Sequence, residues 1–182
     1  EVGTSGDLTL KHDGTDSHIE NNTSNLTITN NADDSDIIFQ SDDGNAGVAT
    51  YFYLDGSSAT HDGSATTALY TNWPDKSRIS VGTGHDLRIY HDGTQSLIDN
   101  TNGDLYIRNF ADDGDIIFQS DDGSGGLATY FSIDGSLATH DGSATTALYT
   151  NWPDNSIVAL GSSRDLVMFH TGTSSFISNY TG

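Results

Sequence analysis

The sequence contains no cysteine, so neither disulfide bonds nor thiolate metal sites contribute to its fold. Its 182 residues include only six lysines and arginines against 26 acidic residues, which gives a formal net charge of −20. A nucleic-acid groove and an anionic membrane surface both require clustered positive charge. No hydrophobic run approaches the roughly 18 residues that indicate a membrane-spanning helix. The composition therefore predicts no nucleic-acid partner and no membrane insertion.

Glutamate is nearly absent, because Glu1 and Glu20 stand against 24 aspartates. The short aspartate side chain bonds nearby backbone and favours turns over helices. Nine Asp-Gly dipeptides, of which Asp13-Gly14 is the first, indicate tight turns that need a positive φ. The apolar segments between them are short and many alternate with a period of two, as at residues 26–28. The sequence therefore predicts an all-β protein of short strands.

The chain repeats itself with an offset of 79 residues. The pattern of residues 8–103 recurs at residues 87–182, with 59 of 96 positions identical, and the most exact part, residues 32–75, differs from residues 111–154 at seven of 44 positions. An array this exact is typical of architecture, in which each unit packs against the next. We expect three repeat units, the last of them truncated, at residues 1–81, 82–160 and 161–182.

Each repeat unit is poor in apolar side chains, since hydrophobic residues make up 34% of the sequence. Such a unit must pack on its neighbours or share a core with other chains. We predict an elongated repeat protein whose strands intertwine in a homotrimeric β-fibre, with an apolar stripe buried around the common axis. A single-chain β-solenoid and tandem small β-sandwich or β-prism units are the alternatives, and the uneven spacing of the apolar segments disfavours the solenoid.

Several segments resemble a known repeat. HDG at residues 91–93, DIIFQSDDG at 115–123 and YFSIDG at 130–135 are similar to the tandem HDG, DIIFQSDDG and YFxLDG segments in tail fibres and other virion structural proteins of marine bacteriophages, especially cyanophages. The resemblance covers nearly the whole chain. It implies an extended, trimeric β-structured fibre in an extracellular appendage of the virion, with the receptor-binding tip elsewhere.

We therefore expect a structural segment of a phage tail fibre or virion fibre that supports host attachment. A carbohydrate-binding module of a virion protein, with a host surface glycan as its partner, is the alternative. A tailspike depolymerase fragment ranks last. The sequence has no Gly-x-Ser-x-Gly, no His-Glu-x-x-His and no phosphate-binding loop, so we expect that the chain is not an enzyme.

Three histidines share one register of the repeat: His12, His91 and His170. If three chains share an axis, each position brings three imidazoles together, and such a ring can hold a transition metal. No His-x-His pair strengthens this interpretation. The alternative is that each histidine precedes a turn and bonds local backbone.

The aspartate-rich turns offer a second kind of metal site. Calcium takes six to eight oxygen ligands, and carboxylates cluster at Asp42, Asp43, Asp121 and Asp122. The alternating aspartates and the closing glutamate of a calcium loop are missing, so the alternative is a turn in which each carboxylate caps backbone N–H groups. We expect no cofactor, and Ca²⁺ and an axial transition metal stay open as alternatives.

Two aromatic pairs recur exactly, Tyr70 with Trp73 and Tyr149 with Trp152. An exposed aromatic pair can stack on the apolar face of a sugar, which would make these residues a carbohydrate platform. The interpretation that we favour is that the rings fill the joint between successive units, because aromatic side chains bury the largest apolar area.

Overall fold

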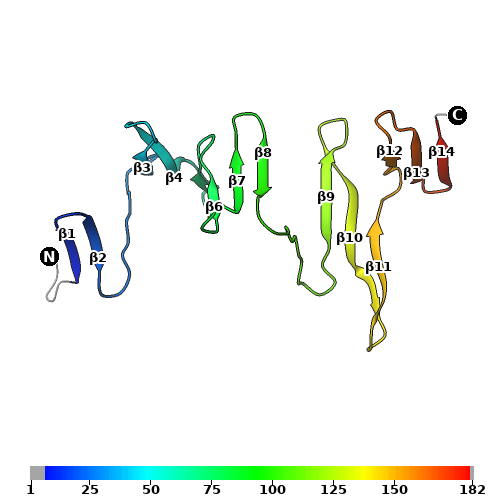
Figure 1. The fold of residues 1–182 in the computed structure, drawn as a ribbon, viewed down its shortest axis with the longest axis horizontal. Coiled ribbons are helices and arrows are strands. Elements are labelled where there is room, and N and C mark those ends of the chain that lie inside the picture. Colours follow the sequence, from blue (N-terminus) through cyan, green and yellow to red (C-terminus); the bar gives the residue numbers. More distant parts are fainter. Residues whose placement is uncertain (1–6, 181–182) are drawn as a thin grey trace. The chain divides into compact units, whose positions relative to one another are not determined.

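The computed structural model describes residues 7–180, which form fourteen β-strands and no helix (Figure 1). The predicted all-β class is confirmed. Every strand pair in this range is antiparallel, and the strands form several small sheets without a closed barrel. A β-solenoid requires parallel pairing between coils, so that alternative does not apply to the described residues. They also contain no helix long and apolar enough to cross a membrane.

The contacts divide the chain into two units, Glu1–Asp104 and Leu105–Gly182. The first unit holds one hairpin and two three-stranded meanders. The hairpin consists of β1 (Leu8–His12) and β2 (Ser17–Asn21). The first meander consists of β3 (Ile37–Asp42), β4 (Val48–His61) and β5 (Thr66–Asn72). The second consists of β6 (Ile79–Val81), β7 (Leu87–His91) and β8 (Ser96–Asn100).

The second unit repeats both meanders at the offset of 79 residues. Its first sheet consists of β9 (Ile116–Asp121), β10 (Leu127–His140) and β11 (Thr145–Asn151). Its second sheet consists of β12 (Val158–Leu160), β13 (Leu166–His170) and β14 (Ser175–Asn179). The expected repeat boundaries after residues 81 and 160 fall inside sheets, because β6 pairs with β7 and β12 with β13. Each of these sheets therefore joins the end of one sequence copy to the start of the next.

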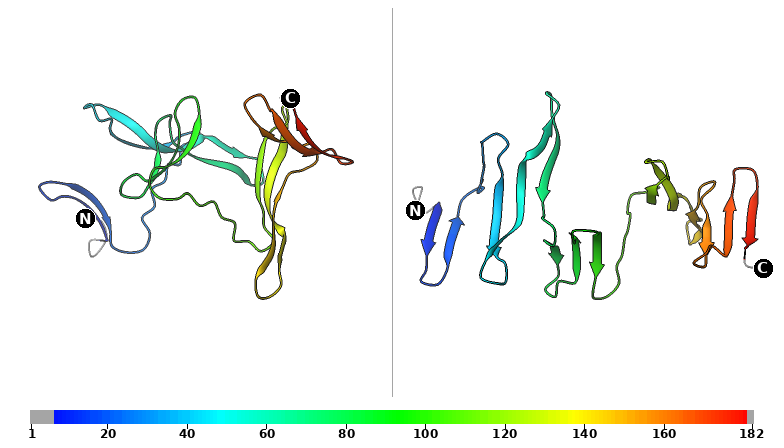
Figure 2. Two further views of the ribbon diagram at one scale, coloured as in Figure 1. Left: turned by 45° about the vertical axis from the view of Figure 1, so that its right-hand side comes forward. Right: turned by 90° about the horizontal axis from the view of Figure 1, so that it is seen from above.

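The longest strands bend in the middle. β4 pairs first with β3 and then with β5, and its register shifts between Asp55 and Thr60; β10 does the same between β9 and β11 (Figure 2). At the bend, the Gly56 N–H donates to Oδ1 of Asp36 at 3.0 Å. A Cβ on Gly56 would overlap the backbone carbonyl of Ser35, so only glycine fits this close approach. The second unit repeats the bond at 2.9 Å.

Little apolar surface is buried by the chain itself. Val167, with 4% of its surface exposed, is the one buried hydrophobic side chain among residues 7–180. Large apolar side chains of the sheets in each unit stay exposed, among them Ile38, Ile89, Ile117 and Ile177. The residues that the structure describes therefore form single-layer sheets, and no β-sandwich forms within a unit.

We predict that Gly56→Ala lowers the free energy of unfolding by about 1–3 kcal/mol, since the added methyl forces the β4 bend away from Ser35. Urea unfolding followed by circular dichroism measures the change. Ala59→Ser, on an exposed position of the same strand, is the matched control and should leave the midpoint within about 0.5 kcal/mol of the original. An unchanged midpoint for Gly56→Ala would show that the bend has room for a side chain.

Candidate functional site

The predicted metal-binding histidines lie at the ends of strands, where they bond nearby groups. Nδ1 of His12 lies 3.4 Å from Ser17 Oγ, and Nδ1 of His170 lies 3.0 Å from Ser175 Oγ. Nδ1 of His91 lies 3.1 Å from the Gly93 nitrogen and 3.0 Å from a carboxylate oxygen of Asp75. A protonated Nδ1 donates to Asp75, and a bare Nδ1 accepts from the Gly93 N–H. Of the three, only His91 bonds local backbone as the alternative expects, and His12 and His170 contact serine side chains across the turn.

The predicted calcium-binding aspartates cap their own turns. Oδ1 of Asp43 accepts N–H bonds from Asn45 at 2.7 Å and Gly47 at 3.0 Å. Asp42, Asp121 and Asp122 likewise accept backbone N–H groups two or four residues ahead. These backbone donors hold the pKa values of Asp43 and Asp122 below the usual aspartate value.

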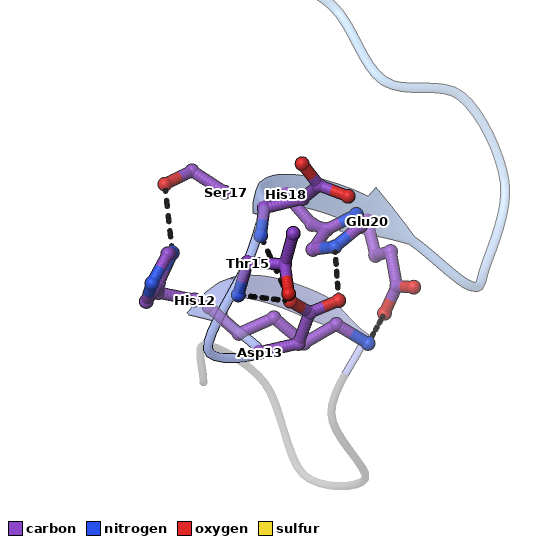
Figure 3. Close-up of polar contacts among 8 residues, drawn as sticks. His12, Asp13, Thr15, Ser17, His18 and Glu20 are labelled. Carbon is purple, nitrogen blue, oxygen red and sulfur yellow. Dashed lines mark hydrogen bonds and ion pairs between the residues drawn. The ribbon is translucent and has the colours of Figure 1, made fainter.

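One group of three ligand-bearing side chains does converge within the described part of the chain: Asp13, Asp16 and His18. Figure 3 labels Asp13 and His18 of this group. Oδ1 of Asp13 accepts the N–H groups of Thr15 and Asp16, and its Oδ2 lies 3.0 Å from Nε2 of His18. Both carboxylates are exposed, and Asp13 is already occupied by protein donors. None of the residues predicted from the sequence to bind a metal belongs to this group.

The tryptophans stack on phenylalanines of their own sheets. Trp73 follows β5 and lies 5.6 Å from Phe52 between ring centroids, and Phe52 lies 4.5 Å from Phe39, so three rings form one stack. Trp152 continues the equivalent stack in the second unit. The described ring contacts do not join Tyr70 to Trp73 or Tyr149 to Trp152. The structure therefore uses each tryptophan to cover a sheet, with one ring face already occupied.

Apolar side chains form a stripe on one face of each short sheet, and all of them are exposed except Val158, which is half-buried. Cross-strand registers align Ile79 with Ile89 and Ile98, and align Val158 with Met168 and Ile177. The β1–β2 hairpin carries the equivalent pair, Leu10 and Ile19, which are 66% and 62% exposed. Exposure reaches 60% at Ile98 and 76% at Ile177. We call these eight residues the apolar stripe.

Each unit also contains a groove between its two meanders, and sequence reasoning missed both. The groove of the first unit has a volume of about 570 Å³ and its lining includes Tyr51, Lys76, Arg78 and Arg88. The groove of the second unit, of about 810 Å³, occupies equivalent positions. Their lining residues come from separate segments of the repeat, and no local motif connects them. The one sequence feature that could have indicated a groove is the cluster of the cations Lys76, Arg78 and Arg88 in an otherwise acidic chain.

Comparison with protein-family models, with curated proteins and with solved structures found no match.

We predict that Trp73→Ala lowers the free energy of unfolding by about 1–3 kcal/mol, less than the roughly 3–5 kcal/mol of a fully buried ring, because Trp73 is 36% exposed. The loss of stacking on Phe52 is the cause. Thermal unfolding followed by circular dichroism measures it. Tyr70→Ala, which removes a half-exposed ring outside the stack, should have a much smaller effect; equal effects would contradict the stacking role.

The carboxylate of Asp141, in the turn between β10 and β11, makes the stability of the fold depend on pH. Backbone N–H groups of Ala144 and Ser143 lower the pKa of Asp141 from 3.8 to about 2. The ionised carboxylate therefore stabilises the fold fully above about pH 4, and this contribution declines as the pH falls towards 2. Asp141→Ala should lower the urea midpoint at pH 7, and the difference from the unmodified chain should be much smaller at pH 2, because the contribution is lost as the pH falls through about 2.

The matched control is Asp112→Ala, which removes a turn carboxylate that accepts no hydrogen bond in the described residues. It should leave the midpoint unchanged at both pH values. A difference for Asp141→Ala that is the same at pH 2 as at pH 7 would contradict the capping role of the carboxylate.

Proposed function

We propose that this chain is a structural segment of a virion fibre, such as a phage tail fibre, and that it assembles as a homotrimer to support host attachment. The single observation that carries the proposal is the exposed apolar stripe, which recurs in the two short meanders and in the first hairpin. An enzyme or a solitary binding module would bury these side chains in a core of its own. A repeated assembly surface instead presents them at a fixed interval.

Burial of the apolar stripe accounts for the stability that a single chain lacks. Fully burying a large aliphatic side chain contributes about 1.5–3 kcal/mol, and each repeat leaves this contribution unused while the stripe faces water. A hairpin of two strands such as β1–β2 is at best marginally stable alone in water. When three copies place their stripes around one axis, the stripe of each copy is covered by the other two.

The occupant of the stripe is another copy of this chain because the stripe repeats with the same period as the rest of the sequence. The stripe positions of one repeat recur 79 residues later as aliphatic residues or methionine. Copies aligned in parallel therefore match stripe to stripe along their whole length. The net charge of −20, carried mainly on aspartate turns, opposes non-specific association and leaves the apolar faces as the favourable contact.

The order of the segments HDG, DIIFQSDDG and YFSIDG supports the virion setting of this proposal, because it resembles repeats of marine phage fibres. The fibre would serve as a spacer that holds a receptor-binding end away from the virion.

Size-exclusion chromatography with light scattering tests the assembly. We expect three times the chain mass of 19.4 kDa. Ile98→Asp combined with Ile177→Asp places two charges on the stripe and should dissociate the trimer, since an unpaired buried charge costs several kcal/mol. Gln95→Asp with Ser174→Asp adds the same charge in the turns of the same two hairpins and should leave the trimer intact.

A stable monomer of 19.4 kDa with a native β-sheet circular dichroism spectrum would refute the proposal. A trimer that survives both stripe substitutions would show that the copies meet through another surface.

A further inference from the structure

The grooves of the two units share one frame. Both are lined by an aspartate, an alanine, a threonine and a tyrosine from the first meander, and by an aspartate and a serine from the segment before the second. Ser77 and its equivalent Ser156 each donate a hydrogen bond to the backbone carbonyl of the lining tyrosine, Tyr51 or Tyr130. The frame therefore brings the two meanders together in the same way in each unit.

Three cationic side chains of the first groove have uncharged equivalents in the second. In the first unit Lys76, Arg78 and Arg88 line the groove, and the second unit has Asn155, Ile157 and Val167 at these positions. These three cations are half of the six lysines and arginines in a chain of net charge −20. The second groove keeps a single cation, Arg164, where the first has His85.

The carboxylates of the first groove are already engaged by the protein. Asp43 accepts two backbone N–H groups of its turn, and Asp75 lies 3.0 Å from the ring of His91. No carboxylate lies within ion-pair distance of Lys76 or Arg78 among residues 7–180. Lys76 and Arg78 therefore have no carboxylate of the groove as a close counter-ion.

The two arginines are held in place by the same short sheet. Arg78 lies over the ring of Tyr90, 4.5 Å from its centroid. Arg88 reaches Asp99 through one nitrogen at 3.4 Å, and its buried Nε has no partner in the described part of the chain. A guanidinium carries five N–H donors, so most of the donor capacity of Arg88 stays unused by protein acceptors.

The groove and the apolar stripe belong to opposite faces of the β6–β7–β8 sheet. Ser80, Arg88 and Asp99 align across the strands on the groove face, one residue out of register with the stripe residues. Side chains alternate between faces along a strand. Covering the stripe by other copies therefore leaves the groove face free for a ligand.

We propose that the groove of the first unit binds a small ligand that carries a carboxylate, sulfate or phosphate group, held by Lys76, Arg78 and Arg88. Charge-assisted hydrogen bonds from guanidinium and ammonium groups suit such oxyanions. Thr50 and Ser80 also line the groove, with hydroxyls that already bond Gln40 and His85 and keep further hydrogen-bonding capacity for a ligand that bears hydroxyls, such as an acidic saccharide. The volume of about 570 Å³ falls in the range of small-molecule sites.

An aspartate turn of a neighbouring copy is the competing occupant, and the repeat disfavours it. The acidic turns recur in both units, as at Asp33-Asp34 and Asp112-Asp113. A contact between copies that used these turns would need cations in both grooves, whereas the second groove has lost three of them. A ligand that binds once per two repeats fits this asymmetry.

The test exchanges the groove residues between units in the full chain. In one variant Lys76→Asn, Arg78→Ile, Arg88→Val and Asp99→Ser give the first groove the residues of the second. In the reciprocal variant Asn155→Lys, Ile157→Arg, Val167→Arg and Ser178→Asp make the opposite change. Each replacement residue already occupies the equivalent position of the other unit. Lys11→Asn with Arg108→Ile is the control, since it alters the net charge by the same −2 away from the groove.

Isothermal titration calorimetry with inorganic sulfate, inorganic phosphate, glucuronate and a sulfated disaccharide measures binding. At least one probe should bind the unmodified chain and the control equally, and at least tenfold more weakly to the first variant, as expected for the loss of charged hydrogen bonds. The reciprocal variant should gain a second site. Sulfate or phosphate alone binding as tightly as the disaccharide identifies the oxyanion as the ligand, and tighter binding of glucuronate or the disaccharide identifies a sugar.

Absence of binding by all probes, or binding that the first variant retains, would overturn the proposal. Light scattering on the same variants tests the competing occupant. A changed mass of the first variant would show that the groove binds an acidic turn of a second copy, and this result would also overturn the proposal. The inference goes beyond the proposed fibre function. Failure of the fibre function would appear as a monomeric unmodified chain, whereas failure of the groove proposal would appear as a titration without binding.

Discussion

Cover for apolar side chains is the constraint on which the rest of this structure depends. Each sheet is a single layer, and its strands alternate between two faces, so a face that carries Ile79, Ile89 and Ile98 has no second layer of the same unit against it. The buried hydrophobic core of the described residues amounts to Val167. Sheets of this kind are stable when a neighbour supplies the missing layer, and the period of 79 residues places the same demand in each full repeat.

The excess of aspartate over glutamate follows from the turns that connect these sheets. A carboxylate one carbon from Cα reaches the N–H groups two and three residues ahead, as Asp13, Asp92 and Asp141 do. Glutamate is one carbon longer and does not favour this geometry. The carboxylates that resembled loose metal ligands in the sequence are thus capping groups, and their negative charge is a consequence of building many short hairpins.

The sequence contained the information for the local structure and little of the information for the contacts between segments. Period-two alternation located the strand around Leu87 and a short apolar run located the strand around Ile37, because both signals are local. The alternation at residues 26–28 and 105–107 predicted strands that the structure does not contain. The pairing of β6 with β7 joins two copies of the repeat. A periodic sequence can be divided at any position of its period, and the unit boundary after residue 81 fell inside this sheet. The stacking of Trp73 on Phe52 and the grouping of Lys76 with Arg88 bring together residues from different strands and loops, and single-sequence patterns do not determine such approaches.

The two faces of the short sheets differ in how strictly the repeat is kept. On the stripe face, Ile79, Ile89 and Ile98 become Val158, Met168 and Ile177, so apolar character persists at every position. On the groove face, the aligned residues Ser80, Arg88 and Asp99 become Ala159, Val167 and Ser178. A surface that joins copies must present the same chemistry in each repeat, because every repeat meets the same neighbour. A surface that meets a small ligand is free to change from one repeat to the next. The alternation of side chains along a strand separates these two requirements, so a single scaffold can satisfy both.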